Sequence, residues 1–144
     1  MENIAILTLA AGASSRMQGR DKLLEMVDGV PLLRLQVQRA LATGFPVYVA
    51  LSASDHPRAN IISDLDATPL IAPLAADGMG VTLRETVAQL PVCDGFLVVL
   101  ADLVALDTPD LQQVLSAPAR HPDHLVWRGA TQVGKPGHPI LFDA

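Results

Sequence analysis

The sequence has few cysteines, few aromatic residues and no excess of positive charge. Cys93 is the only cysteine, so no intrachain disulfide can form and a reducing, cytoplasmic location is expected. Aromatic residues make up 3% of the chain, too few for the stacking surfaces that bind single-stranded nucleic acids. The formal net charge of -5 is unlike the basic field of general nucleic-acid-binding proteins. We therefore expect no nucleic acid among its partners.

Long apolar runs and internal repeats are also missing. No hydrophobic stretch approaches the roughly 20 residues that cross a membrane, and the acidic Glu2 is unlike the basic start of a signal peptide. We therefore expect no membrane association. Hydrophobic residues make up 50% of the sequence, which favours a normal core over disorder. No linker-like change in composition divides the chain, so a single domain over residues 1–144 is predicted.

The sequence does contain an alternation of short apolar runs with amphipathic segments. We predict strands at residues 4–9, 47–51, 69–72, 96–100, 124–127 and 139–142, with a short extended piece at 23–27. Four helices are predicted: one beginning at Pro31, one over residues 55–65, one after Gly80 and one beginning at Thr108. The Thr108 hydroxyl is expected to cap the last of these. This alternation predicts an α/β fold, Rossmann-like, in which a mostly parallel sheet forms the middle of a three-layer sandwich.

A segment rich in small residues, hydroxyls and cations follows the first predicted strand. Residues 7–22 are LTLAAGASSRMQGRDK. Backbone N–H groups at a glycine turn, with cations beside them, suit the phosphates of a nucleoside triphosphate. Ligands of open α/β sheets bind beyond the carboxyl ends of the strands. Asp102 follows the predicted strand 96–100, so it is expected at the same edge, where its carboxylate suits Mg²⁺.

The glycine spacing of this segment fits neither the Walker A motif nor the dinucleotide fingerprint. The longer pattern LAAGxSxRMxGxxK, residues 9–22, resembles the signature of nucleotidyltransferases of the molybdenum cofactor group. These are the cytidylyltransferases and guanylyltransferases that attach a nucleotide to molybdopterin. The matching residues are Leu9, Ala10, Ala11, Gly12, Ser14, Arg16, Met17, Gly19 and Lys22. Residues 9–22 are called the signature segment below.

Four further segments are similar to the same family. They are KLLEMVDGVPLL (22–33), DGMGVTL (77–83), VVLADL (98–103) and GKPGHPILF (134–142). The chain departs from the family pattern at Gln18, where a glycine is usual, at Gly80, which replaces a serine, and at Leu103-Val104, which replaces Met-Pro or Gln-Pro. The resemblance therefore covers nearly the whole chain, with one difference in the expected phosphate loop, at Gln18, and two where the acceptor would bind.

The resemblance implies a fold of the nucleotide-diphospho-sugar transferase type and the transfer of a nucleotide from an NTP to a phosphorylated acceptor, with release of pyrophosphate. CTP is the favoured donor and GTP the alternative, because Ala11 and the Gly-His-Pro element (137–139) both resemble the cytidylyltransferase branch. A molybdopterin-type cofactor is the favoured acceptor, Mg²⁺ the expected metal, and a molybdoenzyme or its chaperone the implied protein partner.

The resemblance also assigns roles to individual residues. Arg16, Lys22 and Asp102 are the expected catalytic residues: the two cations neutralise and orient phosphates, and Asp102 binds the metal. The expected acceptor-binding residues are Gly78, Met79 and His138. The expected nucleotide-binding residues are Leu9, Ala10, Ala11, Gly12, Ser14, Ser15, Arg16, Lys22 and Pro73.

Other interpretations stay open at this point. Asp102 also suits a helix cap or turn, and the Gly-His-Pro element a rigid turn. Asp107 and Asp110 are expected to be capping residues at a helix N-terminus.

The function has two alternatives. A sugar-phosphate or alditol-phosphate nucleotidyltransferase shares the N-terminal signature, but it is expected to lack the Gly-His-Pro element. A non-catalytic protein that binds nucleotide or cofactor for a molybdoenzyme is the other alternative. Family members continue into a GDxGAR-like segment, which the chain, ending at Ala144, does not contain. We therefore expect a C-terminally short form of the fold.

Overall fold

The computed structural model describes the backbone of residues 1–12, 16–17, 20–130 and 136–144. Within these residues, one sheet has six strands in the order β7-β6-β1-β8-β10-β9. The strands are β1 (Ile4–Leu9), β6 (Val47–Leu51), β7 (Ala67–Ile71), β8 (Gly95–Leu100), β9 (Val126–Ala130) and β10 (Pro136–Asp143). The first four run parallel, whereas β10 pairs antiparallel with both β8 and β9. The predicted mostly parallel sheet is confirmed.

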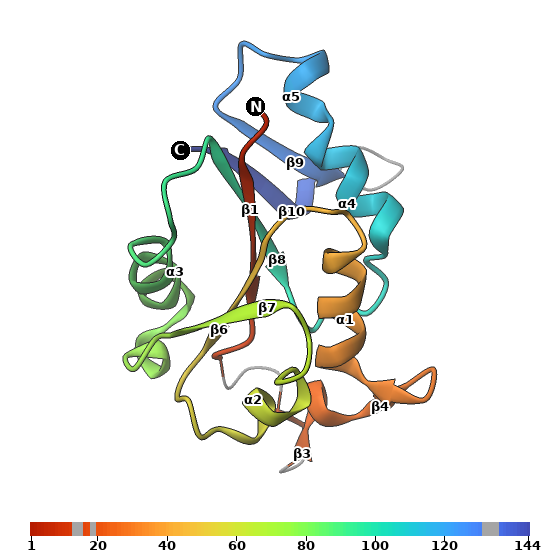
Figure 1. The fold of residues 1–144 in the computed structure, drawn as a ribbon, viewed down its shortest axis with the longest axis vertical. Coiled ribbons are helices and arrows are strands. Elements are labelled where there is room, and N and C mark those ends of the chain that lie inside the picture. The colour runs from red at the N-terminus through yellow and green to blue at the C-terminus, as the bar shows by residue number, and fades with distance from the viewer. Residues whose placement is uncertain (13–15, 18–19, 131–135) are drawn as a thin grey trace.

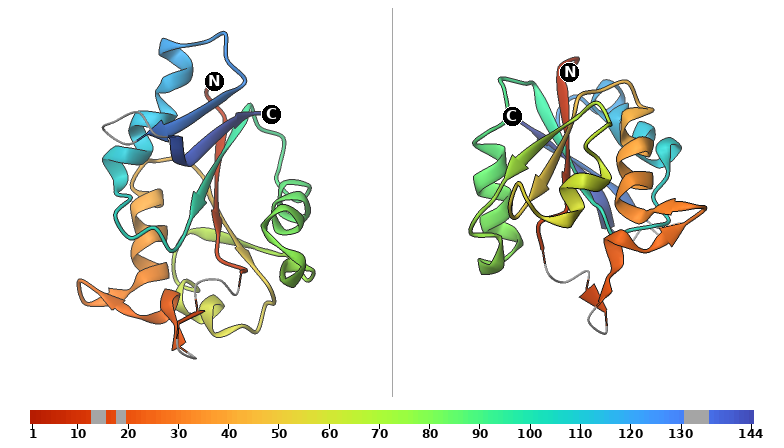
Figure 2. Two further views of the ribbon diagram at one scale, coloured as in Figure 1. Left: turned by 180° about the vertical axis from the view of Figure 1, so that it is seen from behind. Right: turned by 60° about the horizontal axis from the view of Figure 1, so that its bottom comes forward.

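Helices cover both faces of this sheet, as the three-layer prediction requires. Figures 1 and 2 show α1 (Leu32–Leu41) and α4 (Thr108–Leu115) on one face and α3 (Met79–Val87) on the other. The short helix α5 (Ala117–Arg120) follows α4, and α2 (Pro57–Ile61) lies near the carboxyl end of β1. Both chain termini lie at the opposite end of the sheet (Figure 1).

The first strand shows why its sequence is almost continuously apolar. Ile4 and Ile6 belong to the core between the sheet and the α1/α4 layer. Leu7 and Leu9 pack on the other face, in a smaller cluster that includes Leu83 of α3. Side chains alternate between the faces of a strand, so a strand covered on both faces needs apolar residues at successive positions.

Several predicted boundaries and one cap were wrong. In place of an extended piece at 23–27, Lys22–Leu24 forms the 3-10 helix η1, and only β4 (Met26–Val27) is extended. It pairs with β5 (Val30–Pro31) across the predicted Asp28-Gly29 turn. The helix predicted at 55–65 is confined to α2. β7 begins two residues before the predicted strand at 69–72. β9 spans 126–130 where 124–127 was predicted, and β10 spans 136–143 where 139–142 was predicted. Both strands extend past the apolar residues because the hydrogen bonds that pair them do not require apolar side chains.

The cap of α4 also differs from the prediction. Asp107, not Thr108, is the N-cap residue, and its carboxylate accepts a hydrogen bond from the Thr108 backbone N–H at 2.6 Å. Asp110 completes a capping box by accepting from the Asp107 N–H at 2.9 Å. The Thr108 hydroxyl donates to the Arg39 carbonyl of α1 instead, at 2.8 Å. The prediction that Asp107 and Asp110 are capping residues is confirmed.

None of the helices within the described ranges has the length and apolar character needed to cross a membrane. The remaining described elements are β2 (Arg16–Met17), β3 (Arg20–Asp21) and the 3-10 helix η2 (Ala75–Asp77).

Replacing Leu97 tests the burial of the central strand β8, where this side chain is 0% exposed. Leu97→Ala should lower the free energy of unfolding by about 2–5 kcal/mol, because it removes buried apolar surface and leaves a cavity. Denaturant unfolding followed by circular dichroism measures this loss. Val92→Ala is the control, since Val92 is 95% exposed, and its effect should stay within about 0.5 kcal/mol. Equal effects of the two variants would contradict this packing.

Candidate functional site

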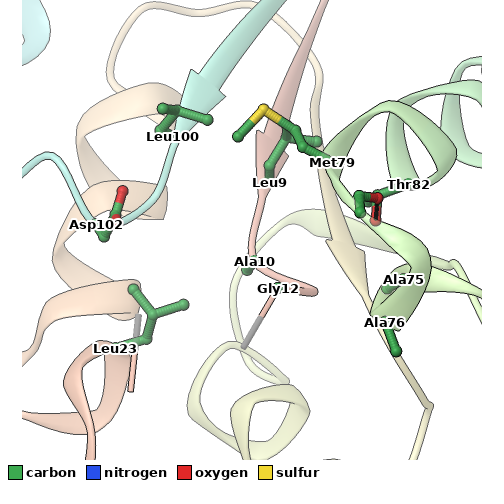
Figure 3. A pocket seen from close by; sticks show the side chains of 11 residues that line it. Leu9, Ala10, Gly12, Leu23, Ala75, Ala76, Met79, Thr82, Leu100 and Asp102 are labelled. Carbon is green, nitrogen blue, oxygen red and sulfur yellow. Dashed lines mark hydrogen bonds between the residues drawn. The ribbon is translucent and has the colours of Figure 1, made fainter. Parts of the chain in front are cut away.

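A cavity of about 380 Å³ lies where β1 and β8 end (Figure 3). Leu9 and Leu100 are the last residues of these two strands and are direct neighbours in their parallel pairing. The cavity is lined by Leu9, Ala10, Gly12, Leu23, Ala75, Ala76, Gly78, Met79, Thr82, Leu100 and Asp102. Its volume falls in the usual range of small-molecule sites, and its position is the one at which open α/β sheets bind ligands.

The two sides of the cavity come from different layers of the fold. Figure 3 shows Leu23 and Asp102 on one side of Ala10 and Gly12, with Ala75, Ala76 and Thr82 on the other. Most of the wall is aliphatic, so it can bury the flat apolar surface of a nucleobase or sugar. Asp102 provides a carboxylate, which can accept hydrogen bonds or bind a cation. The cavity thus combines apolar walls with one acidic group.

The backbone at the end of β1 is held by a buried arginine. Arg58 of α2 donates from Nη1 to the carbonyl oxygens of Ala10 at 2.5 Å and Gly12 at 3.1 Å. Its Nε and Nη2 donate to the two carboxylate oxygens of Asp21, at 2.7 and 2.9 Å. No prediction from the sequence included Arg58 or Asp21, because neither forms a recognisable motif on its own.

Asp21 also positions the start of η1. Its carboxylate accepts a hydrogen bond from the Leu23 backbone N–H at 3.1 Å, which makes Asp21 the N-cap residue of this short helix. Lys22, the first residue of η1, is half-buried and directly precedes Leu23, which lines the cavity. The predicted catalytic lysine is therefore adjacent in sequence to the cavity wall, although it does not line the cavity.

The structure brings six predicted site residues together at this cavity: Leu9, Ala10, Gly12, Gly78, Met79 and Asp102. Four others whose side chains the structure describes do not line it, and one of these, His138, lines a different cavity. Ala11 is buried against Ala72 and Ala75, Pro73 is exposed after the end of β7, and Lys22 lies in η1. Leu23, Leu100, Ala75, Ala76 and Thr82 complete the lining and were not predicted, since isolated small or apolar residues carry no signal of a site.

Some predicted residues lie outside what the structure describes. Ser14 and Ser15 are not among the described residues, and Arg16 is described only as part of the β2 backbone. The roles predicted for these three residues, like those of all the other predicted site residues, stay predictions.

His138 lines a second cavity, of about 720 Å³, formed by α4, α5, β9 and β10. Gly129 of β9 allows β10 to approach closely there, because a Cβ at this position would lie 2.8 Å from the His138 carbonyl oxygen. Burial and the nearby Arg128 cation lower the pKa of His138, and the Asp102 carboxylate partly opposes them. His138 is thus within electrostatic range of Asp102, yet it lines the other cavity.

A metal ion at the first cavity would depend on Asp102. Over the part of the chain that is described, no three His, Cys, Asp or Glu side chains gather into a complete metal site. Mg²⁺ commonly binds through one or two carboxylates and takes its other ligands from phosphates and water. A single aspartate beside a cavity of this size therefore fits such a shared metal site.

A comparison with protein families decides which family the chain belongs to. The sequence profile of the MobA-like NTP transferase domain matches residues 6–144. The chain is a MobA-like NTP transferase domain. This confirms the resemblance carried by the signature segment. No curated protein matches the sequence significantly.

Solved structures share the fold of this NTP transferase domain. Rv0371c from Mycobacterium tuberculosis H37Rv, which was also solved as a complex with manganese, has a TM-score of 0.79 at 20% identity, covering 98% of this chain and 71% of its own. A nucleotidyl transferase from Methanothermobacter thermautotrophicus has a TM-score of 0.81 at 20% identity, covering 99% and 72%. At these identities the likeness supports the fold alone.

A third structure of the same fold contains a nucleotide. CMP:2-keto-3-deoxy-manno-octonic acid synthetase complexed with CTP has a TM-score of 0.71 at 20% identity, covering 87% of this chain and 51% of its own. The predicted fold of the nucleotide-diphospho-sugar transferase type is confirmed.

The lowered pKa of His138 predicts how stability depends on pH. Because the folded protein binds this proton less readily than the unfolded chain, the unfolding free energy should fall as pH drops below the ordinary histidine value of 6.5. His138→Gln should therefore lose less stability than the native chain between about pH 7.5 and about pH 5.5. Urea unfolding in metal-free buffer measures the difference. NMR titration of the imidazole, assigned with the same variant, would contradict this if His138 titrated above 6.5.

Proposed function

We propose that this NTP transferase domain transfers CMP from CTP, with Mg²⁺, to the phosphate of a molybdopterin-type cofactor and releases pyrophosphate. The observation that carries the proposal is the cavity itself. In it, Ala10 and Gly12 of the signature segment lie between Asp102 on one side and η2 with the start of α3 on the other. GTP is the alternative donor.

The reaction proposed is attack by an acceptor phosphate oxygen on the α-phosphorus of CTP. The bond from the α-phosphorus to the bridging oxygen breaks, and pyrophosphate takes that electron pair. The barrier of such a transfer is mostly alignment and accumulated charge, so no side-chain nucleophile is needed.

The residues at the cavity, together with Lys22 and Arg16, have the following parts in this proposal. The aliphatic walls at Leu9 and Leu100 exclude water and hold the nucleoside, and Gly78 and Met79 are proposed to bind the acceptor. The backbone of Ala10–Gly12 faces the phosphates, and Lys22 and Arg16 are proposed to neutralise them. Asp102 would hold Mg²⁺, which supplies additional positive charge at the phosphates when bound.

Two observations on other proteins support the donor and metal. One structure of this fold is a synthetase complexed with CTP, and another is a complex with manganese. Within this chain, Ala11 and the Gly-His-Pro element are the features that favour cytidine. A molybdoenzyme or its chaperone is proposed to take the product, and a reducing cytoplasm, which suits the single Cys93, is the proposed location.

Calorimetric titration with CTP, GTP, ATP and UTP in the presence of Mg²⁺ tests the proposal. CTP should bind most tightly, and Asp102→Asn should weaken its binding at least about tenfold, because the amide removes the charge that holds the metal. Asp123→Asn is the matched control: it makes the same chemical change at an exposed turn, and the affinity should not change.

Turnover distinguishes the transferase from a protein that only binds its nucleotide. With molybdopterin and CTP, the native chain should release pyrophosphate, and the Asp102→Asn variant should not. Magnesium-independent binding, or equal affinity in the Asp102 and Asp123 variants, would overturn the metal assignment. Tight CTP binding without pyrophosphate release would instead identify a non-catalytic binding protein.

A further inference from the structure

Arg58 forms a buried ion pair with Asp21, a residue of the signature segment. Their side chains are only 3% and 7% exposed. Removing two charges from water costs several kcal/mol per ion, and the cost is recovered only where hydrogen bonds of good geometry surround both. Arg58 meets this condition, because Nε, Nη1 and Nη2 donate to oxygens of Ala10, Gly12 and Asp21. A buried charge arranged in this way indicates a position that the fold holds firmly.

The guanidinium group joins the beginning and the end of the signature segment. Nη1 binds the carbonyls of Ala10 and Gly12, which precede residues 13–20. Nε and Nη2 bind Asp21, which follows them. Because the guanidinium is planar and rigid, both sets of partners are fixed relative to one another. Arg58 therefore sets the separation between the beginning and the end of this segment.

The same bonds orient the backbone at the end of β1. A trans peptide places its C=O and N–H on opposite sides, so the Ala10 carbonyl turned toward Arg58 directs the Ala11 N–H away from it. In Figure 3, α2, the pale yellow helix, lies below Gly12, while Leu9, Leu100 and Met79 lie above. A buried cation on one side thus orients the Ala10–Ala11 peptide dipole, whose N–H end is directed away from the cation, as an anion requires.

Asp21 extends this arrangement to the predicted catalytic lysine. The carboxylate that binds Arg58 also caps η1 through the Leu23 N–H. Lys22 begins η1, so its backbone position depends on Asp21, which depends in turn on Arg58.

We propose that Arg58, acting through Asp21, is a positioning residue that holds the backbone of Ala10–Gly12 and Lys22 in the geometry that binds a triphosphate. This inference rests on the proposed function, because it concerns the nucleotide phosphates. Arg58 is proposed as a positioning and not a catalytic residue, since Nε, Nη1 and Nη2 each donate to a protein oxygen. Its effect should be confined to the phosphates, while the nucleoside is held by the aliphatic walls.

The Arg34–Asp64 pair provides a control that also tests for a general disturbance of α2, because Arg34 Nη1 donates to the Ile61 carbonyl at 3.2 Å as well. Arg34 of α1 binds both oxygens of Asp64 at 2.7 and 2.9 Å, in the same two-bond manner. This pair is more exposed than Arg58–Asp21, and neither residue lines the cavity. Arg34→Met therefore removes an arginine–aspartate pair without touching the signature segment.

The experiment measures two affinities for each protein, after thermal melting has shown that it is folded. Calorimetry gives the dissociation constant for CTP with Mg²⁺, and NMR titration gives that for cytidine. Arg58→Met should weaken CTP binding about tenfold to a hundredfold, the scale of a small misplacement of a binding group, and leave cytidine binding unchanged. Arg58→Lys keeps the positive charge but not the planar guanidinium with its several donors, so its CTP affinity should lie between those of the native chain and Arg58→Met. Arg34→Met should match the native chain.

If Arg58→Met does not fold, Asp21→Asn provides the same test, because the amide keeps the shape and an oxygen for the Leu23 N–H. It should weaken CTP binding and spare cytidine. An unchanged CTP affinity in a folded Arg58 or Asp21 variant would overturn the inference, and so would equal losses for CTP and cytidine. Failure of the native chain to bind any triphosphate would be seen before any variant is made, and would overturn the proposed function itself together with this inference.

Discussion

The parallel pairing of β1 with β8 is the interaction on which the site depends. It places Leu9 beside Leu100, so the two chain segments that leave the sheet at these residues start from neighbouring points. One is the signature segment, and the other leads to Asp102. Hydrogen bonds along the whole length of both strands hold this register, and a shift by one residue would exchange the buried faces of β1. The alignment of the cavity walls is therefore built into the core.

The helices that cover both faces of the sheet supply the remaining walls of the cavity. The layer of α1 and α4 packs against the larger core cluster, and the connection from α1 leads through β6 to α2 and Arg58. On the other face, α3 packs on Leu7 and Leu70, and its first turn brings Gly78 and Met79 to the cavity. The same helices that shield apolar strands from water thus surround the cavity.

The site separates apolar and charged functions in space. Aliphatic side chains line most of the cavity, and Asp102 adds a carboxylate to its lining. The buried cation, Arg58, does not line the cavity but binds the backbone carbonyls of Ala10 and Gly12, which do. A charge that is bonded to the backbone and lies outside the cavity can orient backbone dipoles without being neutralised by the ligand. Charges placed in this way fit a reaction whose barrier is mostly the alignment and accumulated charge of phosphates.

The sequence by itself determined the family, the central strands and much of one cavity. β1, β6 and β8 were predictable because strands covered on both faces are almost continuously apolar, and Asp102 because it follows such a strand. Only the tertiary structure decided that Arg58 meets Asp21, and that His138 lines a different cavity from Asp102. Local patterns record which residues are buried and where strands end. Contacts between residues distant in the chain depend on how the layers pack, which no local pattern records.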